Sequence, residues 1–329
     1  MRHLWIHPTC VSVLLGVAAM PVAADRLPMA WPAGEQREYH AHWKRQLRPP
    51  ISAEPAGMNA EQTGTVRVQV TRPLADGVAL KWLPRLAAAV PGAGRAPEPT
   101  DAIWRIPLRL DLELKVRPDA AEWISLVNAE AVSTQVYAAV RALFDQVGLT
   151  FDCSPRDGST QDVLCQQIGT PAGVVNWVLR GVEPFFACTA LDFPEAGRVE
   201  WTQDHDHPAI GSEVPMRYVR ELIEGATGDA TVRIRTTIEP DAEKLKAWWD
   251  KQLAAMAGLD PGLQAQLSGL RYRFVTDCTV EVASGWPVRV EKISTGSLDT
   301  PFEGTETLLL EAVRPIPGAD PVSGNRGPG

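Results

Sequence analysis

Alternating apolar and polar residues predict that most of this chain is β-structure. In residues 106–116, leucines alternate with charged residues, a period of two that is typical of a strand with one buried and one exposed face. Residues 65–71 show the same period, and the Asp76-Gly77 pair that follows them is a hairpin signature. Further strands are predicted at residues 78–82, 123–127, 231–234, 270–282, 288–293 and 305–313.

Three other segments favour helices. Residues 128–147 carry valines and leucine on one helical stripe, and the Gly148 that follows favours a helix end there. Residues 241–257 place apolar side chains near helical spacing after acidic residues that suit a helix N-terminus. Residues 170–180 form a short apolar segment that is predicted to be helical, whereas residues 216–224 fit either a helix or a strand.

The order of these elements is similar in the two halves of the chain. We therefore predict an α+β fold dominated by antiparallel sheet, built as two similar halves that are each a curved sheet with a covering helix. The alternative is one continuous antiparallel sheet or open barrel that the chain visits twice. Proline-rich stretches at 48–57 and 84–101 are predicted to be linkers. The predicted units are a signal peptide (1–24), a first α+β half (25–150), a cysteine-bearing connecting segment (151–194), a second α+β half (195–314) and a disordered tail (315–329).

Residues 1–24 have the three-part order of a secretory signal peptide. Arg2 gives a basic start, residues 10–20 form an apolar run, and small residues lead to a cleavage site near Ala24. The apolar run is shorter than the roughly 20 residues that span a bilayer. We therefore predict a periplasmic or secreted protein whose mature chain has no transmembrane segment.

The cysteines beyond that cleavage site are predicted to form disulfides, because export brings them into an oxidising compartment. Four of the five cysteines remain there, and four allow three pairings. Cys153 and Cys165 flank a segment rich in turn residues, which favours a local Cys153–Cys165 bridge and leaves Cys188–Cys278 as a long-range one. Zinc binding by these cysteines is disfavoured because the chain has no CxxC pair.

The composition limits the classes of function. Hydrophobic residues make up 45% of the chain and charged residues 22%, which is ordinary for a globular protein and excludes disorder of the whole chain. The net charge of −8 without a basic block makes nucleic acid a poor partner. The sequence has no Gly-x-Ser-x-Gly elbow, His-Glu-x-x-His motif or phosphate-binding glycine loop. It therefore predicts no cofactor and favours a non-enzymatic protein over an enzyme.

One cluster has the residue types of a metal site, since histidine nitrogens and aspartate oxygens bind divalent metals such as zinc. A metal-dependent hydrolase would use His205 and His207, and the alternative is a polar turn before Pro208. His40 and His42 repeat the alternating pair, and the favoured interpretation there is a half-buried edge strand with both imidazoles on one face. The cluster consists of Asp204, His205, Asp206 and His207.

Trp248 and Trp249 are adjacent in the predicted helix at 241–257. Neighbouring helical residues differ by 100°, so the two indoles do not both face one core. Core packing is the default for a tryptophan. The second interpretation is that one of this pair lines a groove for an apolar or carbohydrate ligand.

The signal peptide and the hairpins in residues 65–82, 108–128 and 282–288 resemble a group of uncharacterised bacterial secreted or periplasmic envelope proteins. The architecture is also similar to the open-barrel periplasmic lipoprotein carriers, in which a curved antiparallel sheet wraps a helix-plugged apolar cavity. The resemblance covers most of residues 36–313 and implies no functional residue. It implies an exported protein that binds an apolar or amphipathic ligand, or an envelope protein partner, on a concave sheet. A structural or interaction protein without a cavity is the alternative to this hypothesis, beside the metal-dependent hydrolase.

Overall fold

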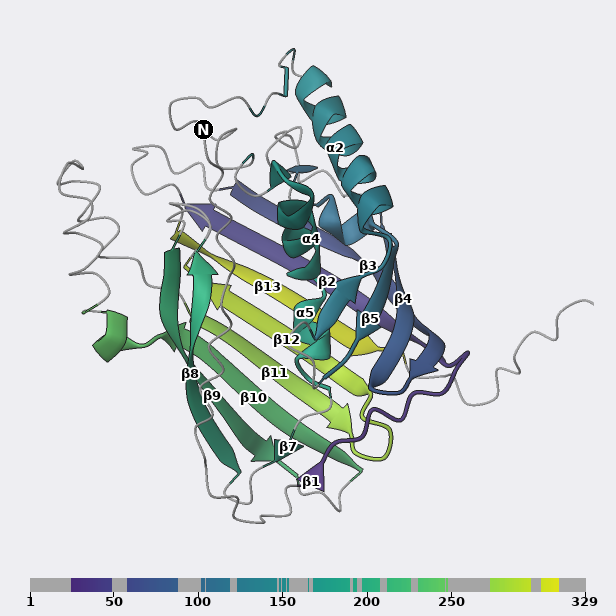
Figure 1. Ribbon diagram of the computed structural model, residues 1–329, viewed down its shortest axis with the longest axis vertical. Helices are drawn as coiled ribbons and strands as arrows, with labels where there is room; N and C mark the ends of the chain where they lie inside the picture. The colour runs from purple at the N-terminus through teal and green to yellow at the C-terminus, as the bar shows by residue number, and fades with distance from the viewer. Residues whose placement is uncertain are drawn as a thin grey trace, which may run out of the picture.

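An 11-stranded antiparallel sheet dominates the computed structural model of the protein (Figure 1). A second, two-stranded sheet pairs β1 (Asp25–Arg26) with β7 (Asp192–Phe193). The structure describes residues 25–48, 58–87, 102–103, 105–118, 123–146, 148, 150–151, 153, 165, 168–189, 192–193, 197–207, 212–225, 230–245, 247, 273–296 and 303–313.

The first long strand of the chain, β2, and the last, β13, pair in the middle of the large sheet, from Tyr39 opposite Ala312 to Arg48 opposite Glu303. Strands β3 to β6 extend the sheet on one side of this pair and β12 to β8 on the other. In spatial order the strands are β6 (Ile124–Leu126), β5 (Leu112–Val116), β4 (Gly77–Leu86), β3 (Met58–Leu74), β2 (Gln36–Arg48), β13 (Glu303–Ala312), β12 (Pro287–Thr295), β11 (Arg273–Glu281), β10 (Thr231–Pro240), β9 (Ser212–Glu224) and β8 (Arg198–His207).

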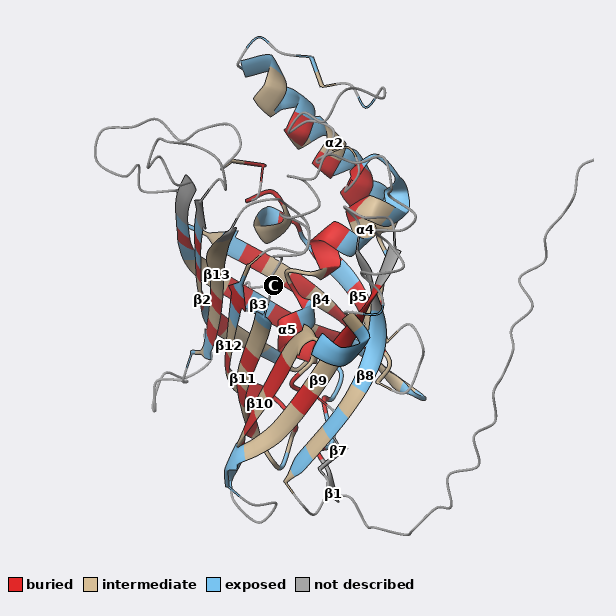
Figure 2. Cartoon of the chain, turned by 90° about the vertical axis from the view of Figure 1, so that its left-hand side faces the viewer, coloured by how far each residue is buried: buried red, intermediate tan, exposed pale blue. Residues whose placement is uncertain are grey.

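The sheet has an apolar face and a charged face. Along β4, every second residue from Val78 to Pro84 is buried, and β5 alternates in the same way. We call the buried face the inner face and the opposite one the outer face. In Figure 2, buried residues alternate with others along the strands of the curved sheet, and α5 (Glu183–Phe186) lies inside its curve. Large inner-face side chains on β2, β4 and β5 are Tyr39, Trp43, Leu80, Trp82, Leu112 and Leu114.

Two further helices, α2 (Ala129–Gln146) and α4 (Pro171–Leu179), continue this cover, since α4 contacts β6 and α2 contacts α4. Thr170 caps α4 by accepting a hydrogen bond from the Gly173 amide at 3.0 Å. On α5, the ring of Phe185 meets Tyr39 and Trp82 edge-on, with centroids 5.1 and 5.4 Å apart. The cover therefore packs into the inner face through aromatic contacts.

Two disulfides are present, Cys153–Cys165 and Cys188–Cys278, which are the pairs that the sequence predicts. Cys188 follows α5 and Cys278 lies on the inner face of β11, and both side chains are buried. The long-range bridge therefore fixes the end of α5 to the sheet. Disulfides of this kind are consistent with an extracytoplasmic protein.

The strand predictions at 65–71, 78–82, 231–234, 288–293 and 305–313 are confirmed, with the observed strands extending beyond most of them. The predicted strands at 123–127 and 270–282 correspond to β6 and β11, and the helices at 128–147 and 170–180 to α2 and α4. Residues 216–224 belong to a strand, β9. Antiparallel sheet thus dominates the fold, as predicted.

Other predictions need correction. Residues 106–116 are not one strand, because a 3-10 turn, η1 (Pro107–Arg109), precedes β5; Pro107 lacks the amide hydrogen that a strand ladder needs. The predicted linker at 84–101 begins inside β4, which runs to Leu86. The two predicted halves share one continuous sheet instead of forming two sheets, which is the arrangement of the alternative prediction.

Some predictions stay untested. The signal peptide at 1–24 and the tail at 315–329 lie outside the described residues, and the proposed unit boundaries stay predictions. In the predicted helix 241–257, residues 242–245 and 247 are helical and residue 241 is not. Residues 246 and 248–257 lie outside the described part of the chain.

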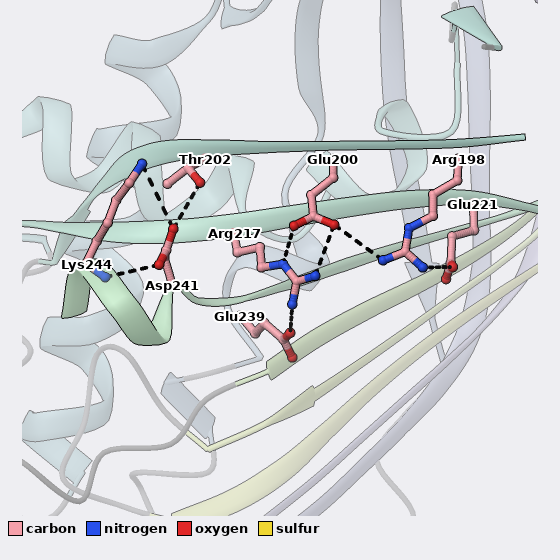
Figure 3. A network of polar contacts seen from close by, with 8 residues as sticks. All are labelled: Arg198, Glu200, Thr202, Arg217, Glu221, Glu239, Asp241 and Lys244. Carbon is pink, nitrogen blue, oxygen red and sulfur yellow. Dashed lines mark hydrogen bonds and ion pairs between the residues drawn. The ribbon is translucent and has the colours of Figure 1, made fainter. Parts of the chain in front are cut away.

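Ion pairs connect the strands on the outer face, and Figure 3 shows one network across β8, β9 and β10. Arg217 binds Glu200 at 2.6 Å and Glu239 at 3.4 Å. Hydrogen bonding from Arg217 to Glu200 holds the pKa of Glu200 below its ordinary value. The side chains are exposed, so each pair adds little stability. The outer face is therefore a charged, hydrated surface.

Asp277 on β11 is the most enclosed carboxylate of these ion pairs, with 13% of its side chain exposed. Hydrogen bonds from Arg235, at 2.7 and 2.9 Å, and from Arg233, at 2.9 Å, outweigh burial and lower its pKa. A lowered pKa in the folded state stabilises the fold above the unfolded value of about 3.9, and this contribution is lost as the pH falls through the folded pKa. We expect Asp277→Asn to lower the free energy of unfolding by about 1–2 kcal/mol at pH 7.

Urea unfolding at pH 7 and at pH 2.5 checks this prediction, because the difference between wild type and Asp277→Asn should shrink at the lower pH. The matched control is Asp111→Asn, which breaks an exposed pair with Arg85 at 2.8 Å and should change stability far less. A difference that persists unchanged at pH 2.5 would assign the effect of Asp277→Asn to packing and not to charge.

Candidate functional site

A small cavity lies on the inner face, between the sheet and the segments that cover it. Its volume is about 30 Å³, which holds about two water-sized groups. Strands β2, β3, β4 and β13 form its floor, and η1 and the turn between α4 and α5 form its cover. The lining residues are Ala41, Trp43, Gln62, Val66, Trp82, Pro84, Leu86, Pro107, Leu108, Gly181, Val182, Leu308 and Leu310.

Ala41 has the smallest side chain among the residues of the sheet that line the cavity. It lies on β2 opposite Gly64 on β3, and Leu310 on β13 and Leu86 on β4 belong to the same row. The space beside Gly64 is filled by β4, since a Cβ atom at Gly64 would lie 2.5 Å from the Arg85 carbonyl oxygen. In this row the cavity therefore borders Ala41 and not Gly64.

Gln62 is the polar group of the cavity, and only 2% of the residue is exposed. Its Nε2 atom donates hydrogen bonds to the carbonyl oxygens of Ala87, at 2.5 Å, and Thr63, at 3.3 Å. Its Oε1 atom is buried and has no hydrogen-bond partner in the part of the chain that the structure describes. A buried acceptor without a donor costs about 1–3 kcal/mol, so Gln62 is a feature that needs explanation.

The polar groups of the neighbouring residues Trp43 and Arg45 are directed to another partner, Glu306. The indole Nε1 of Trp43 donates to Glu306 at 3.0 Å, and Arg45 lies 3.9 Å from the same carboxylate. None of the described residues that line the cavity is ionisable. Their surface is apolar apart from the amide of Gln62, which offers one hydrogen-bond acceptor.

The structure places the predicted metal residues in two separate regions. Residues 204–207 are in β8, where Asp204 is exposed and the side chains of His205, Asp206 and His207 lie outside the described residues. His40 and His42 are in β2, and strands β13, β12, β11, β10 and β9 separate β2 from β8. Among the described side chains, no group of three or more His, Cys, Asp or Glu is arranged to hold a metal ion.

The prediction that residues 39–43 form an edge strand is wrong, because β13 pairs with β2 on the side opposite β3. The alternation itself is confirmed, since Tyr39, Ala41 and Trp43 are buried together, and His42 on the other face binds Glu61 at 2.9 Å. A central strand must bury one face fully, which explains the burial of both aromatic rings.

The two tryptophans that the sequence offers as ligand-binding residues, Trp248 and Trp249, lie outside the described residues. Their role stays a prediction. In the helices that the structure describes, no stretch is long and apolar enough to cross a membrane.

Comparisons with known proteins do not assign a family. No protein-family profile and no characterised protein matches the sequence. Among solved structures, a lipovitellin chain described in terms of lipid–protein interactions matches with a TM-score of 0.38 and 12% identity, over 86% of this chain. The match covers 25% of that lipovitellin chain, so this chain spans about a quarter of its length. The protein is thus similar to lipovitellin only in a coarse way, and its resemblance to the lipoprotein carriers stays a prediction.

Proposed function

We propose that the protein is an exported, non-catalytic binding protein of the cell envelope that holds the apolar part of an amphipathic ligand against the inner face of its sheet. The apolar cavity carries this proposal. It lies where the sheet meets its cover, and all its lining residues except Gln62 are apolar or glycine. Burial of apolar surface is the main source of affinity for such a ligand, at about 25 cal/mol per Å².

The outer face does not suit this function, because ion pairs and hydrogen bonds occupy it from β8 to β5. The inner face of β2 to β5 presents aromatic and aliphatic side chains instead. An apolar ligand would therefore select the inner face.

The cavity must widen to accept more than the end of an alkyl chain, since its volume is about 30 Å³. The turn between α4 and α5 is held through the nearby Cys188–Cys278 bridge. None of the three residues of η1 is buried. Segments with few buried contacts open at the lowest free energy, so we infer that the ligand enters by displacement of η1.

A variant that fills the cavity tests the proposal. Ala41→Val adds two methyl groups at a residue that lines the cavity. We expect 1-decanol to bind at least about tenfold more weakly, a loss of about 1.4 kcal/mol. The free energy of unfolding should stay within about 1 kcal/mol of wild type, because the added volume fits an existing space. Isothermal titration calorimetry and urea unfolding measure the two quantities.

Ala79→Val is the matched control, since Ala79 pairs with Lys115 in the outer-face register of β4 and should leave 1-decanol binding unchanged. Native mass spectrometry of protein purified from its own cells adds a second test, in which a mass lost on denaturation identifies the ligand. Absence of both 1-decanol binding and a bound mass would contradict the proposal.

The second candidate is a structural or interaction protein without a ligand. The observation that favours it is the filling of the inner face by the protein's own rings, since Trp31, Phe185, Phe186 and Trp286 are buried in one aromatic cluster. For this candidate, wild type and Ala41→Val would both fail to bind 1-decanol.

A further inference from the structure

The unpartnered acceptor in the cavity bears on the chemistry of the ligand. Gln62 lines the cavity and only 2% of the residue is exposed. Among the described residues, no group donates a hydrogen bond to its Oε1 atom. A fold that buries a polar atom in this way gains when a ligand supplies the missing partner.

The orientation of the amide follows from its surroundings. The atom facing the Ala87 and Thr63 backbone is met by two carbonyl oxygens, which accept hydrogen bonds, so that atom must be the nitrogen. A flipped amide would bring Oε1 to 2.5 Å from the Ala87 carbonyl oxygen, where two acceptors repel. The oxygen is therefore the group left without a partner, and the cavity needs a hydrogen-bond donor.

The lining also restricts the charge of that donor. None of the described residues that line the cavity is ionisable, so neither an ammonium nor a carboxylate group would find a counter-charge among them. A buried ion without a partner costs several kcal/mol. A carboxylate would in addition place an acceptor against the Gln62 oxygen. A neutral hydroxyl group can donate a hydrogen bond to the Gln62 oxygen without burying a charge.

The size of the cavity agrees with this chemistry. A volume of about 30 Å³ has room for a hydroxyl group and the carbon that carries it. Trp43, Val66 and Trp82 line the space around such a carbon with apolar surface.

We propose that the ligand is a neutral amphiphile with a hydroxyl group at the end of its apolar chain, and that this hydroxyl donates a hydrogen bond to Oε1 of Gln62. This inference rests on the proposed function, because it names the head group of the ligand whose apolar part the inner face holds. Fatty alcohols and acylglycerols both have this chemistry.

The experiment compares four probes of equal length on the mature protein by isothermal titration calorimetry at pH 7. They are 1-decanol, methyl nonyl ether, decanoic acid and decylamine. We expect 1-decanol to bind at least about tenfold more tightly than the ether, which lacks the donor, and than either charged probe. Tighter binding of 1-monodecanoylglycerol than of 1-decanol would identify an acylglycerol as the source of the hydroxyl, and the reverse order a free fatty alcohol.

Gln62→Met keeps the length of the side chain and removes the acceptor, so the ratio of alcohol to ether affinity should fall to about one. Gln69→Met is the matched control, because Gln69 is on the same strand, opposite Lys81 in the outer-face register, and the ratio should not change. The comparison of 1-decanol with methyl nonyl ether on the wild-type protein needs no variant. It therefore tests the hydroxyl inference even if Gln62→Met fails to fold.

Equal binding of 1-decanol and methyl nonyl ether to wild type would overturn the hydroxyl inference and leave the proposed function standing. A preference for the alcohol that persists in Gln62→Met would also overturn it, since another group would then hold the hydroxyl. Failure of all probes to bind would overturn the proposed function itself.

Discussion

Replacing Cys188 and Cys278 together with alanine should lower the free energy of unfolding by about 4–5 kcal/mol. The two residues are 90 positions apart, and the chain-entropy relation assigns a loop of that length about this stabilisation. Alanine is the appropriate replacement because both sites are buried and alanine adds no polar group there. Urea unfolding under oxidising conditions measures the loss.

The same variant should loosen the cover of the inner face. Phe185 and Phe186 pack against the sheet just before Cys188, so loss of the bridge leaves these aromatic contacts as the attachment of α5. Compared with wild type, we expect the variant to show faster hydrogen exchange in residues 183–189 and a smaller change in β2. Unchanged exchange there would show that the aromatic contacts alone hold the cover.

The other disulfide provides a matched control. Cys153 and Cys165 are 12 positions apart, and a loop of that length predicts about 3 kcal/mol in the same relation. Cys153→Ala with Cys165→Ala should therefore cost less and leave exchange in α5 unchanged. Equal losses in the two double variants would contradict the loop-length explanation.

The strands were predictable where one face of the sheet is apolar and the other charged. Val66, Val68 and Val70 alternate with polar residues, and that pattern is visible without any structure. The order of strands was not predictable in the same way, because local alternation does not say which strand pairs with which. The pairing of β2 with β13 joins residues at opposite ends of the chain, and no sequence signal marks it.

The candidate site was predictable only in part. The register of Val66 and Val68 extends back to Gln62 and Gly64, so a polar residue and a glycine on the buried face were signals of a special position. The predicted strand began at residue 65 and missed both. The closeness of Ala41 and Gly64 depends on the pairing of β2 with β3, which only the structure supplies.

The two faces of the sheet differ in character: the outer face is charged and in contact with water, and the inner face is apolar. The outer face spreads charge over many exposed ion pairs, and the loss of any one of them has a small effect. The inner face concentrates its stability in buried rings, one disulfide and close backbone contacts at glycines. The largest effects of substitution are therefore expected on the inner face and at the ends of its strands.

One of these close backbone contacts is at Gly285, and Gly285→Ala should lower the free energy of unfolding by at least about 3 kcal/mol. The residue has φ of 72°, which is the left-handed region that favours glycine. A Cβ atom there would lie 1.6 Å from the carbonyl oxygen of Pro28, so the segment that follows the predicted cleavage site must move away. That segment places Trp31 in a stack with Trp286, with ring centroids 4.0 Å apart.

Near-UV circular dichroism should report the loss of this indole stack, and urea unfolding the loss of stability. Gly34→Ala is the matched control, because Gly34 has φ of 84° and nothing within 4 Å of the added carbon. It should cost only the left-handed conformation of an alanine, about 1 kcal/mol. Equal losses for Gly34→Ala and Gly285→Ala would mean that backbone conformation alone matters at Gly285. A larger loss at Gly285 would show that the contact of this turn with Pro28 and the stack of Trp31 on Trp286 stabilise the fold.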